Sequence, residues 1–231
     1  MTGRLAVITG GGTGIGRATA ERLLSEGWRV IAVGLDRDDD LPEDIRFHKA
    51  DVTDTVAMLS ALDGENGLHG FVHCAGILRH EKEWQIADFD AVMKVNVSAG
   101  FALANALLPR LEAAGGSIVM LASMWAIFGS AGAPAYTASK GAVAAVTRSM
   151  AVAWAPKGVR VNSVAPGWVE TRMSARARTD GERAGLINGR IPMGRWAQPS
   201  EIASVIRFLL SPDAAYVTGT MLPIDGGYSV C

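Results

Sequence analysis

The sequence predicts an α/β protein in which one parallel β-sheet is covered by helices on both faces. Short, continuously apolar segments recur along the chain, and such segments are typical of strands that are buried on both faces. Helix-length segments separate them, as crossovers between parallel strands require. The chain has 231 residues, which is short for two well-formed domains, so we expect one domain over residues 1–231.

The composition is that of a soluble protein with a sizeable core. Hydrophobic residues make up 49% and charged residues 19% of the chain, and the formal net charge is −1 at pH 7. This balance gives no bulk attraction to nucleic acid or to anionic membranes. The two cysteines, Cys74 and Cys231, form no disulfide framework or metal-binding pair, so we expect a reducing compartment and no bound metal.

The sequence shows no targeting or membrane-spanning signal. Glycines interrupt the amino-terminal apolar run directly after Thr9, so the run is too short for a secretory signal peptide. Charged residues or glycines break every later run before it reaches the roughly 18 residues that a membrane span needs. We therefore expect a cytoplasmic protein.

A glycine-rich turn separates the first two predicted strands, Leu5–Ile8 and Val30–Val33. It reads TGGGTGIG over residues 9–16 and leads into a helical pattern, which makes a βαβ unit with a right-handed crossover. Backbone N–H groups and the dipole at a helix N-terminus attract the pyrophosphate of a dinucleotide, and a Cβ would hold it off. The position of the turn predicts a dinucleotide-binding, doubly wound domain of Rossmann type.

The segment after the second strand carries both kinds of residue that distinguish NAD from NADP. Asp36 could accept hydrogen bonds from the adenosine ribose of NAD, and Arg37 could bind the 2′-phosphate of NADP. The acidic residues at 38–40 form a solvated loop in the simplest interpretation. From these residues alone, the choice between NAD and NADP is not decided.

A third, shorter strand is predicted at Ile45–His48. It leads into Asp51 and Val52. Thr53 or Asp54 then suits the N-cap of a following helix.

The fourth predicted strand, Leu68–His73, leads into Cys74-Ala75-Gly76. Cys74 is interpreted as a small, inert, buried thiol, because nothing nearby in the sequence would activate it. A long helix is expected from Trp84 to Leu111, with Asn96 amid apolar residues and glycines at 115–116 as its stop.

The fifth predicted strand, Ile118–Leu121, ends at Ser123 and leads to a helix that contains Tyr136 and Lys140. Residues four apart lie on the same face of a helix, one turn from each other. A phenol beside an ammonium, near a hydroxyl at a strand end, could transfer a proton to or from a substrate. A pair with this spacing also arises by chance, so its meaning depends on the rest of the chain.

The last part of the chain is expected to complete a seven-stranded sheet. A strand at Val159–Val164 leads into the Pro166-Gly167 turn, and a helix at Pro199–Leu210 precedes a strand at Met221–Ile224. Between them, residues 172–196 are rich in Arg, Gly and Met and have poor periodicity. We expect this segment to be a mobile substrate lid. Its arginines could favour an anionic substrate or form a solvated helix face.

Several motifs occur in one order along nearly the whole chain: TGxxxGxG at residues 9–16, Asn96, Ser123, Tyr136-x-x-x-Lys140 and Pro166-Gly167. Together they resemble the classical branch of the short-chain dehydrogenase/reductase family. The resemblance implies that Asn96, Ser123, Tyr136 and Lys140 are catalytic.

The roles that the resemblance implies are distinct. Tyr136 acts as acid and base, because Lys140 and the oxidised nicotinamide lower a phenol pKa that is ordinarily about 10. Ser123 orients the reacting oxygen, and Lys140 also holds the nicotinamide ribose. Asn96 lies where the helix is distorted and holds a water that links to Lys140. The cofactor supplies the hydride chemistry, and no metal is required.

The resemblance also implies a cofactor-binding set, drawn from the glycine-rich turn, the strand ends and the segment after the Pro-Gly turn. Its members are Gly10, Gly12, Thr13, Gly14, Ile15, Gly16, Asp36, Arg37, Asp51, Val52, Ala75, Gly76, Tyr136, Lys140, Pro166, Gly167, Val169 and Thr171.

Three positions depart from the family pattern. Cys74 stands where the family has an Asn that stabilises the central sheet, and Gly34 stands where its NAD-selecting Asp usually lies. Thr13 occupies the position where many NADP-preferring members carry a basic residue. The last departure favours NAD over NADP.

The implied activity is that of an NAD(P)-dependent oxidoreductase, which transfers a hydride between a nicotinamide cofactor and a secondary alcohol or ketone. An NADP-dependent 3-oxoacyl-thioester reductase and a non-catalytic cofactor-binding regulator are the alternatives. Family members are commonly tetramers joined through two long helices, so we expect a homo-oligomer, a tetramer or a dimer, without nucleic-acid or membrane partners. Candidate residues of the substrate pocket are Met124, Trp125, Phe128, Trp168 and Met173.

Overall fold

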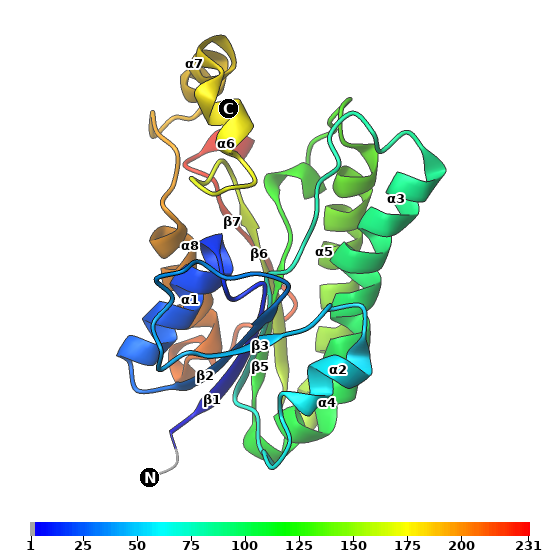
Figure 1. Cartoon of the computed structure of the whole chain (residues 1–231), viewed down its shortest axis with the longest axis vertical. Coiled ribbons are helices and arrows are strands. Elements are labelled where there is room, and N and C mark those ends of the chain that lie inside the picture. The colour runs from blue at the N-terminus through cyan, green and yellow to red at the C-terminus, as the bar shows by residue number, and fades with distance from the viewer. Residues whose placement is uncertain (1–2) are drawn as a thin grey trace.

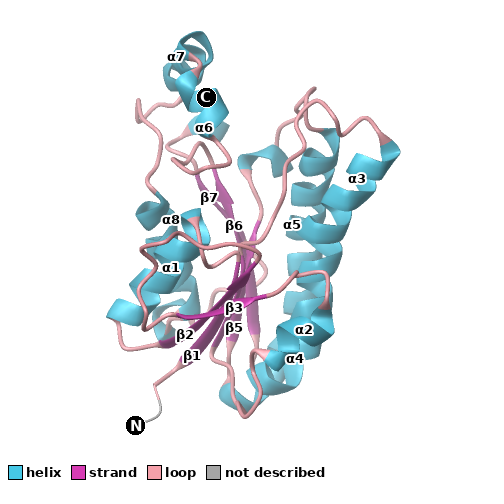
Figure 2. Ribbon diagram, in the orientation of Figure 1, coloured by secondary structure: helices cyan, strands magenta, loops and turns pink. Residues whose placement is uncertain are grey.

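The computed structural model describes residues 3–231. Within them an all-parallel, seven-stranded sheet has the order β3-β2-β1-β4-β5-β6-β7, shown in magenta in Figure 2. The strand order proceeds outward from the β1–β4 pair in both directions, which is the doubly wound arrangement that the sequence predicts. The strands are β1 (Leu5–Thr9), β2 (Arg29–Gly34), β3 (Arg46–Lys49), β4 (Gly70–His73), β5 (Ser117–Leu121), β6 (Arg160–Pro166) and β7 (Met221–Ile224).

The central strands bury side chains on both faces of the sheet. In β1, Leu5 and Val7 belong to one core cluster, whereas Ala6 and Ile8 belong to the other. Successive side chains of a strand point to opposite faces. A strand covered on both sides is therefore apolar throughout, which is why the sequence shows continuous runs and not alternation.

Helices cover both faces of the sheet (Figure 1). On one face, α1 (Gly14–Ser25) packs against α8 (Pro199–Leu210). The other face carries α2 (Thr55–Ser60), α4 (Gly100–Ala114) and α5 (Pro134–Trp154). Short 3-10 turns occupy Met124–Ala126, Ala155–Lys157, Pro212–Ala214 and Tyr228–Val230.

The long helix is interrupted in its middle. It consists of α3 (Ile86–Met93), a π-helical segment (Lys94–Ala99) and α4. Its limits are Ile86 and Ala114, not the predicted Trp84 and Leu111. Gly115 ends it in a left-handed conformation with φ +59°, because a glycine adopts that conformation without steric cost.

By length and composition alone, one helical stretch within residues 3–231 is long and apolar enough to cross a membrane. This stretch is Ile86–Ala114, with a mean hydropathy of 1.4. The core helix of a folded domain passes the same test. Leu103, Leu107 and Leu111 of this stretch are buried in the core cluster beneath the sheet, which accounts for its apolar character.

Differences at other elements are confined to their ends. The strand predicted from Leu68 begins at Gly70, because the Leu68 N–H donates to the carbonyl oxygen of Arg110 in α4. The N-cap of α2 is Asp54, whose carboxylate accepts a hydrogen bond of 3.0 Å from the Ala57 N–H.

Residues 172–196 are more regular than their sequence pattern suggests. They contain α6 (Ala175–Thr179) and α7 (Gly181–Arg190), which lie at the end of the molecule that carries the C-terminus (Figure 1). The Asp180 carboxylate begins α7 by accepting a hydrogen bond from the Arg183 N–H. Ile187 and neighbouring residues form a small separate core cluster. The helical order of this segment thus depends on local contacts that the poor periodicity does not reveal.

Candidate active site

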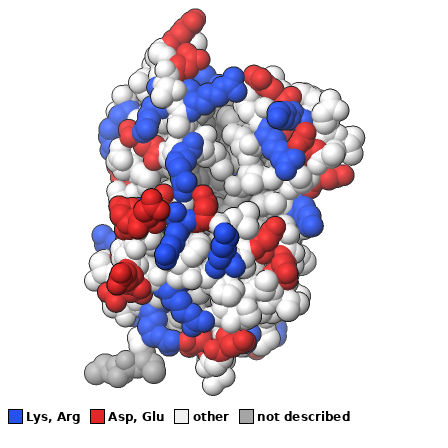
Figure 3. Space-filling view, viewed as in Figure 1, with Lys and Arg blue, Asp and Glu red and all other residues white. Residues whose placement is uncertain are grey.

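A cavity of about 640 Å³ opens at the carboxyl edge of the sheet. All strands are parallel, so their carboxyl ends meet at this edge, and the order reverses between β1 and β4. Figure 3 shows a hollow in the upper half of the molecule with Lys and Arg side chains on both sides. Predicted site residues that line the cavity are Gly10, Thr13, Gly14, Ile15, Gly16, Asp36, Asp51, Val52, Ala75, Gly76, Ser123, Tyr136, Lys140, Pro166, Gly167, Val169 and Thr171.

The glycine-rich turn builds one end of the cavity. Gly10 has a φ of +64°, and a Cβ at Gly16 would lie 2.2 Å from the Gly10 carbonyl oxygen. Only glycine lets α1 begin this close to β1. Within the described residues, the Thr13 side chain makes no capping bond to α1, and the first turn of α1 holds no acidic residue. The helix start therefore offers N–H groups and a positive dipole end that fit a dinucleotide pyrophosphate.

The segment after β2 separates the two residues proposed to select the cofactor. Asp36 lines the cavity, whereas the Arg37 guanidinium lies over the Phe47 ring, 5.6 Å from its centroid. Gly12 is also absent from the cavity wall. A Cβ there would meet the Asp36 carbonyl oxygen at 2.4 Å, so Gly12 packs against the backbone of this segment. Gly12 and Arg37 thus pack behind the nucleotide end, and neither is part of its lining.

Asp36, Asp38 and Asp40 after β2 form ion pairs, so this segment is not simply a solvated loop. The Arg172 guanidinium reaches them from the segment after β6, 3.3 Å from the Asp36 carboxylate and 3.1 Å from that of Asp38. Arg17 of α1 also pairs with Asp38, at 3.0 Å. Arg172 therefore connects the beginning of the lid segment with the nucleotide end of the cavity.

The three polar groups at β5 and α5 come together as predicted. The Lys140 Nζ lies 5.1 Å from the centroid of the Tyr136 ring and donates a hydrogen bond of 2.6 Å to the Leu121 carbonyl oxygen. Ser123 follows that strand end, and its Oγ accepts a hydrogen bond from the Trp125 N–H at 3.2 Å. The Lys140 ammonium is thus held at the end of β5, beside Ser123 and Tyr136.

Burial dominates the protonation of the two α5 groups. It raises the pKa of Tyr136 to about 12, against the opposing effect of the Ser123 hydroxyl. It also lowers the pKa of Lys140 to about 8. The sequence predicts a lowered phenol pKa from the neighbouring ammonium. The structure contradicts this prediction: burial raises the phenol pKa, and the group that opposes the rise is the Ser123 hydroxyl. The Lys140 ammonium is instead engaged by the Leu121 carbonyl group.

Asn96 stands behind the cavity, in the π-helical segment. Its Oδ1 accepts from the Ile77 N–H at 2.8 Å, and its Nδ2 donates to the Ile77 carbonyl oxygen at 3.0 Å and to the Ser139 Oγ at 3.1 Å. A Cβ at Gly76 would lie 3.3 Å from the Asn96 Oδ1 and 3.7 Å from the Lys140 Nζ. The helix distortion expected at Asn96 is confirmed, and it lets this residue tie the loop after β4 to α5.

The end of β4 is held to β1 by polar contacts. The Nδ1 of His73 lies 2.9 Å from the Thr9 Oγ1, which also accepts a hydrogen bond from the Ala75 N–H. Burial lowers the pKa of His73 to about 4 and raises that of the Cys74 thiol to about 12. Both groups are therefore neutral at neutral pH. Cys74 is half-buried and lines the cavity, so the sequence-based prediction of a buried thiol is wrong, whereas its raised pKa fits an unreactive one.

Aromatic side chains extend from Tyr136 along the substrate half of the cavity. Trp125 meets Tyr136 edge-to-face, with ring centroids 5.4 Å apart. The ring centroid of Trp168 lies 6.2 Å from that of Trp125. Trp125 and Trp168, both predicted as pocket residues, line the cavity, but Phe128 does not. An aromatic wall beside the Ser123 and Tyr136 hydroxyls suits a substrate with both C–H and O–H groups.

The structure places in the cavity wall two ionisable residues that no sequence pattern marked, Arg79 and His80 of the loop after β4. Arg176 and Arg183, two of the arginines of residues 172–196 that the sequence suggests could favour an anionic substrate, also line it. Glu83 of the loop after β4 is 1% exposed. These residues lie in segments without helical or strand periodicity, so their positions follow only from tertiary packing.

Known proteins resemble this chain along its whole length. A family model described as enoyl-(acyl carrier protein) reductase matches residues 10–229. Galactitol 2-dehydrogenase (L-tagatose-forming) of Cereibacter sphaeroides is 40% identical, across 100% of this chain and 96% of its own. The 2-dehydro-3-deoxy-D-gluconate 5-dehydrogenase of Escherichia coli K12 is 33% identical, across 99% and 96%. A 3-oxoacyl-[acyl-carrier-protein] reductase of Thermotoga maritima is also 33% identical, across 98% of both chains.

A solved structure shares the fold of this chain. It comes from Agrobacterium tumefaciens, is provisionally named a 2-deoxy-D-gluconate 3-dehydrogenase, and was solved with bound NADP. Its TM-score is 0.89 at 36% identity, and the match covers 99% of this chain and 97% of that one.

Proposed function

Since the chain belongs to the short-chain dehydrogenase/reductase family and is an NAD(P)-dependent oxidoreductase of secondary alcohols and ketones, we propose that it oxidises a secondary hydroxyl of a polyol or sugar acid, or reduces the matching ketone. Tyr136 is the acid and base of this reaction. The observation that carries the proposal is the grouping of its phenol with Ser123 and the Lys140 ammonium in the wall of the cavity.

The residues of the chain supply positioning and proton transfer. During oxidation, the Ser123 hydroxyl orients the substrate oxygen, and the Tyr136 phenolate accepts its proton while a hydride leaves the same carbon. In the reduction direction, the Tyr136 phenol returns that proton to the carbonyl oxygen. The cationic form of Lys140 stabilises the phenolate. Asn96 holds the loop after β4 against α5 and so keeps both walls in place.

The glycine-rich turn, the carboxylate of Asp36 and the segment after β6 would hold NAD(P), which supplies the hydride acceptor or donor when bound. We propose a preference for NAD, because Asp36 lines the cavity whereas Arg37 is turned toward Phe47. The NADP-bound structural relative makes NADP the alternative. Binding of both cofactors, measured side by side, decides between them.

The charges of the cavity wall favour an acidic substrate over a neutral one. The acidic lining residues, Asp36 and Asp51, follow β2 and β3 at the nucleotide end, whereas Arg79 and His80 follow β4, and Arg183 belongs to the lid. A carboxylate at the substrate end would form charge-assisted hydrogen bonds with these basic groups. The similarity to an enzyme of 2-dehydro-3-deoxy-D-gluconate also supports a sugar acid.

A substrate panel tests the proposal through the absorbance of reduced cofactor. Aldonic acids and matching polyols are offered with NAD and NADP, and Tyr136→Phe should lose turnover on all of them while still binding cofactor.

Arg183→Met should raise the KM for the acid by about tenfold, which is the effect of one charge-assisted hydrogen bond. The KM for the polyol should stay unchanged. An equal change for both substrates would contradict the anionic assignment. Cofactor binding without turnover on any alcohol or ketone would favour a regulator.

A 3-oxoacyl-thioester reductase is the second candidate. The similarity to the Thermotoga maritima reductase favours it, and Trp125 and Trp168 form an apolar wall that an acyl chain could contact. A higher kcat/KM for a 3-oxoacyl thioester with NADPH than for any polyol or sugar acid would establish it.

The protein is also proposed to be a cytoplasmic homotetramer assembled through α4 and α5. Phe101 and Val152 are exposed on these helices, and the exposed Ala102 and Ala145 would permit close packing. Ala104 and Ala144 are buried in the monomer, so they contribute to its core instead. Sedimentation velocity measures the oligomeric state.

A further inference from the structure

Glu83 is a buried carboxylate for which the proposed reaction has no direct use. It lies in the loop after β4 and is 1% exposed. Its Oε1 accepts a hydrogen bond of 2.8 Å from the Arg79 N–H, and its Oε2 accepts one of 2.8 Å from the Tyr136 N–H. One side chain thus joins the backbone of a cavity-lining loop to the backbone of the proposed acid and base.

The carboxylate acts as the missing cap of α5. The N-cap residue Ala133 provides no side-chain hydrogen bond, and Pro134 at the first helical position has no N–H. Tyr136 is the third helical residue, the position that an N-cap side chain ordinarily satisfies. Among residues 3–231, Glu83 has no salt-bridge partner within 4 Å, so the two N–H groups and the dipole of the 21-residue helix α5 are what compensate for burying its charge.

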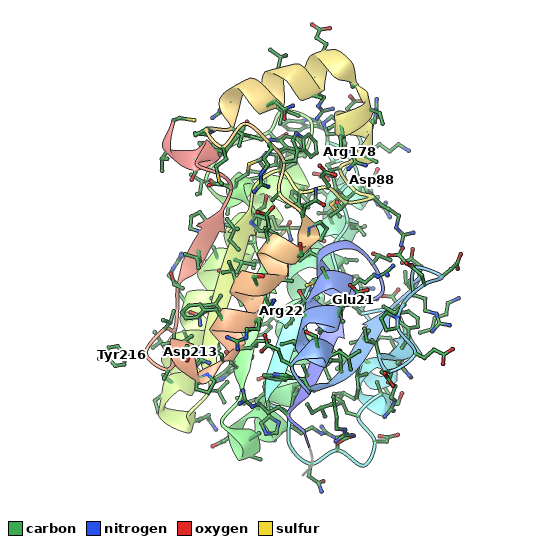
Figure 4. The ribbon with its side chains drawn as sticks, turned by 90° about the vertical axis from the view of Figure 1, so that its left-hand side faces the viewer. Glu21, Arg22, Asp88, Arg178, Asp213 and Tyr216 are labelled. Carbon is green, nitrogen blue, oxygen red and sulfur yellow. The ribbon has the colours of Figure 1, made fainter. Side chains whose placement is uncertain are left out.

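Further contacts hold the same loop against the start of α5. The Glu81 N–H donates to the Gly132 carbonyl oxygen at 2.7 Å, and the Trp84 indole N–H donates to the Ala131 carbonyl oxygen at 2.9 Å. The Arg79 side chain pairs with Asp88 of α3, which Figure 4 labels in the upper part of the molecule. The loop is therefore joined to the start of α5 at several points, and Glu83 is its buried connection.

We propose that Glu83 is a positioning residue, whose carboxylate sets the place of the Tyr136 phenol relative to the substrate wall formed by Arg79 and its neighbours. This inference rests on the proposed role of Tyr136. A displacement of about 1 Å at a reacting group is enough to lower a rate by as much as 100-fold. The consequence of losing Glu83 should therefore appear in kcat more than in the affinity for cofactor.

Glu83 also acts on the phenol through its charge. The Lys140 ammonium and the Ser123 hydroxyl lie near the phenol, and Cys74 after β4 acts on Lys140. Glu83 lies at the backbone of Tyr136. The negative charge of Glu83 is one of the causes that raise the pKa of Tyr136, after burial. Removing it should move the titration of the phenol to lower pH.

The test compares Glu83→Gln with Glu112→Gln, an identical change at an exposed glutamate that pairs with Lys157. Glutamine offers a single acceptor oxygen, so one of the two N–H groups loses its partner. We expect Glu83→Gln to lower the kcat of alcohol oxidation at least tenfold, to move its pH profile to lower pH and to leave cofactor affinity within about twofold. Glu112→Gln should change none of these. An unchanged kcat and pH profile in Glu83→Gln would overturn the proposal.

A second variant separates positioning from stability. Adding Ala133→Ser to Glu83→Gln restores a local N-cap, so the melting temperature should recover while kcat stays low. If the melting temperature and kcat both recovered, Glu83 would act only as a helix cap, and the positioning role would be overturned. Amide hydrogen exchange at Tyr136 and Arg79 needs no substrate, and it should accelerate in Glu83→Gln but not in Glu112→Gln. Unchanged exchange at both amides would also refute the proposal, whatever the substrate proves to be.

Discussion

Tyr136 shows how burial and charge compete at one residue. Partial burial in the cavity wall raises the pKa of its phenol to about 12, and the hydroxyl of Ser123 only partly offsets that effect. A group in this state is a good proton donor for ketone reduction at neutral pH. As a base for alcohol oxidation it must first lose a proton that burial makes harder to lose.

The pH dependence of the two directions should therefore be opposite. The phenolate fraction grows about tenfold per pH unit below the pKa, so kcat/KM for alcohol oxidation should rise from neutral to alkaline pH. Ketone reduction needs the protonated phenol and should not gain from alkali. Initial rates in both directions, measured across this range with saturating cofactor, check the prediction.

Lys140 should limit this rise. Burial lowers its pKa to about 8, so above that pH the cation that favours the phenolate is lost and the increase in oxidation rate should flatten. An oxidation rate that falls steadily from neutral pH upward would contradict the assignment of Tyr136 as the base.

The glycine-rich turn and α1 show what an element requires of its residues. The turn must bring a helix N-terminus next to the end of β1, and Gly16 makes this possible by lying against the Gly10 carbonyl group. The same closeness leaves the first N–H groups of α1 near the cavity that would receive a pyrophosphate.

Gly16→Ala should weaken cofactor binding by at least tenfold, which corresponds to about 1.4 kcal/mol. The added Cβ would lie 2.2 Å from the Gly10 carbonyl oxygen, so either the turn or the helix must move. Fluorescence titration with the reduced cofactor measures the loss. Gly185→Ala is the matched control, because a Cβ there meets nothing within 4 Å. Equal affinities in both variants would show that the turn tolerates the shift.

At the scale of the whole molecule, the site is shared by distant parts of the chain. The cavity wall combines the turn after β1, the loops after β4 and β5, the start of α5 and the segment 172–196. Arg172 joins this segment to Asp36 at the nucleotide end. A ligand that fills this cavity contacts all of these parts, so its binding should stabilise the entire fold.

Saturating NAD(P)H should therefore raise the melting temperature. At 100 times Kd the stabilisation is about 2.7 kcal/mol, which corresponds to roughly 5–10 °C for a protein of this size. Differential scanning fluorimetry with each cofactor checks the shift and ranks NADH against NADPH. The Gly16→Ala variant should show a smaller shift at the same cofactor concentration, and equal shifts in both proteins would contradict the role of the turn.

The sequence by itself determined the order of strands and helices, the glycine-rich turn and the pairing of Tyr136 with Lys140. These features depend on residues near one another in the chain, because strand burial, helix period and turn geometry are short-range properties. Family resemblance added Asn96, and its helix distortion is present.

Tertiary structure alone decided which of the candidate residues share the cavity. It turned Arg37 toward Phe47, and it brought Arg172 to Asp36 from the opposite side of the nucleotide end. It also placed Glu83 under the Tyr136 N–H, although the two are separated by more than fifty residues. Such contacts depend on how whole elements pack, and no local pattern in the sequence encodes which distant partner a loop residue meets.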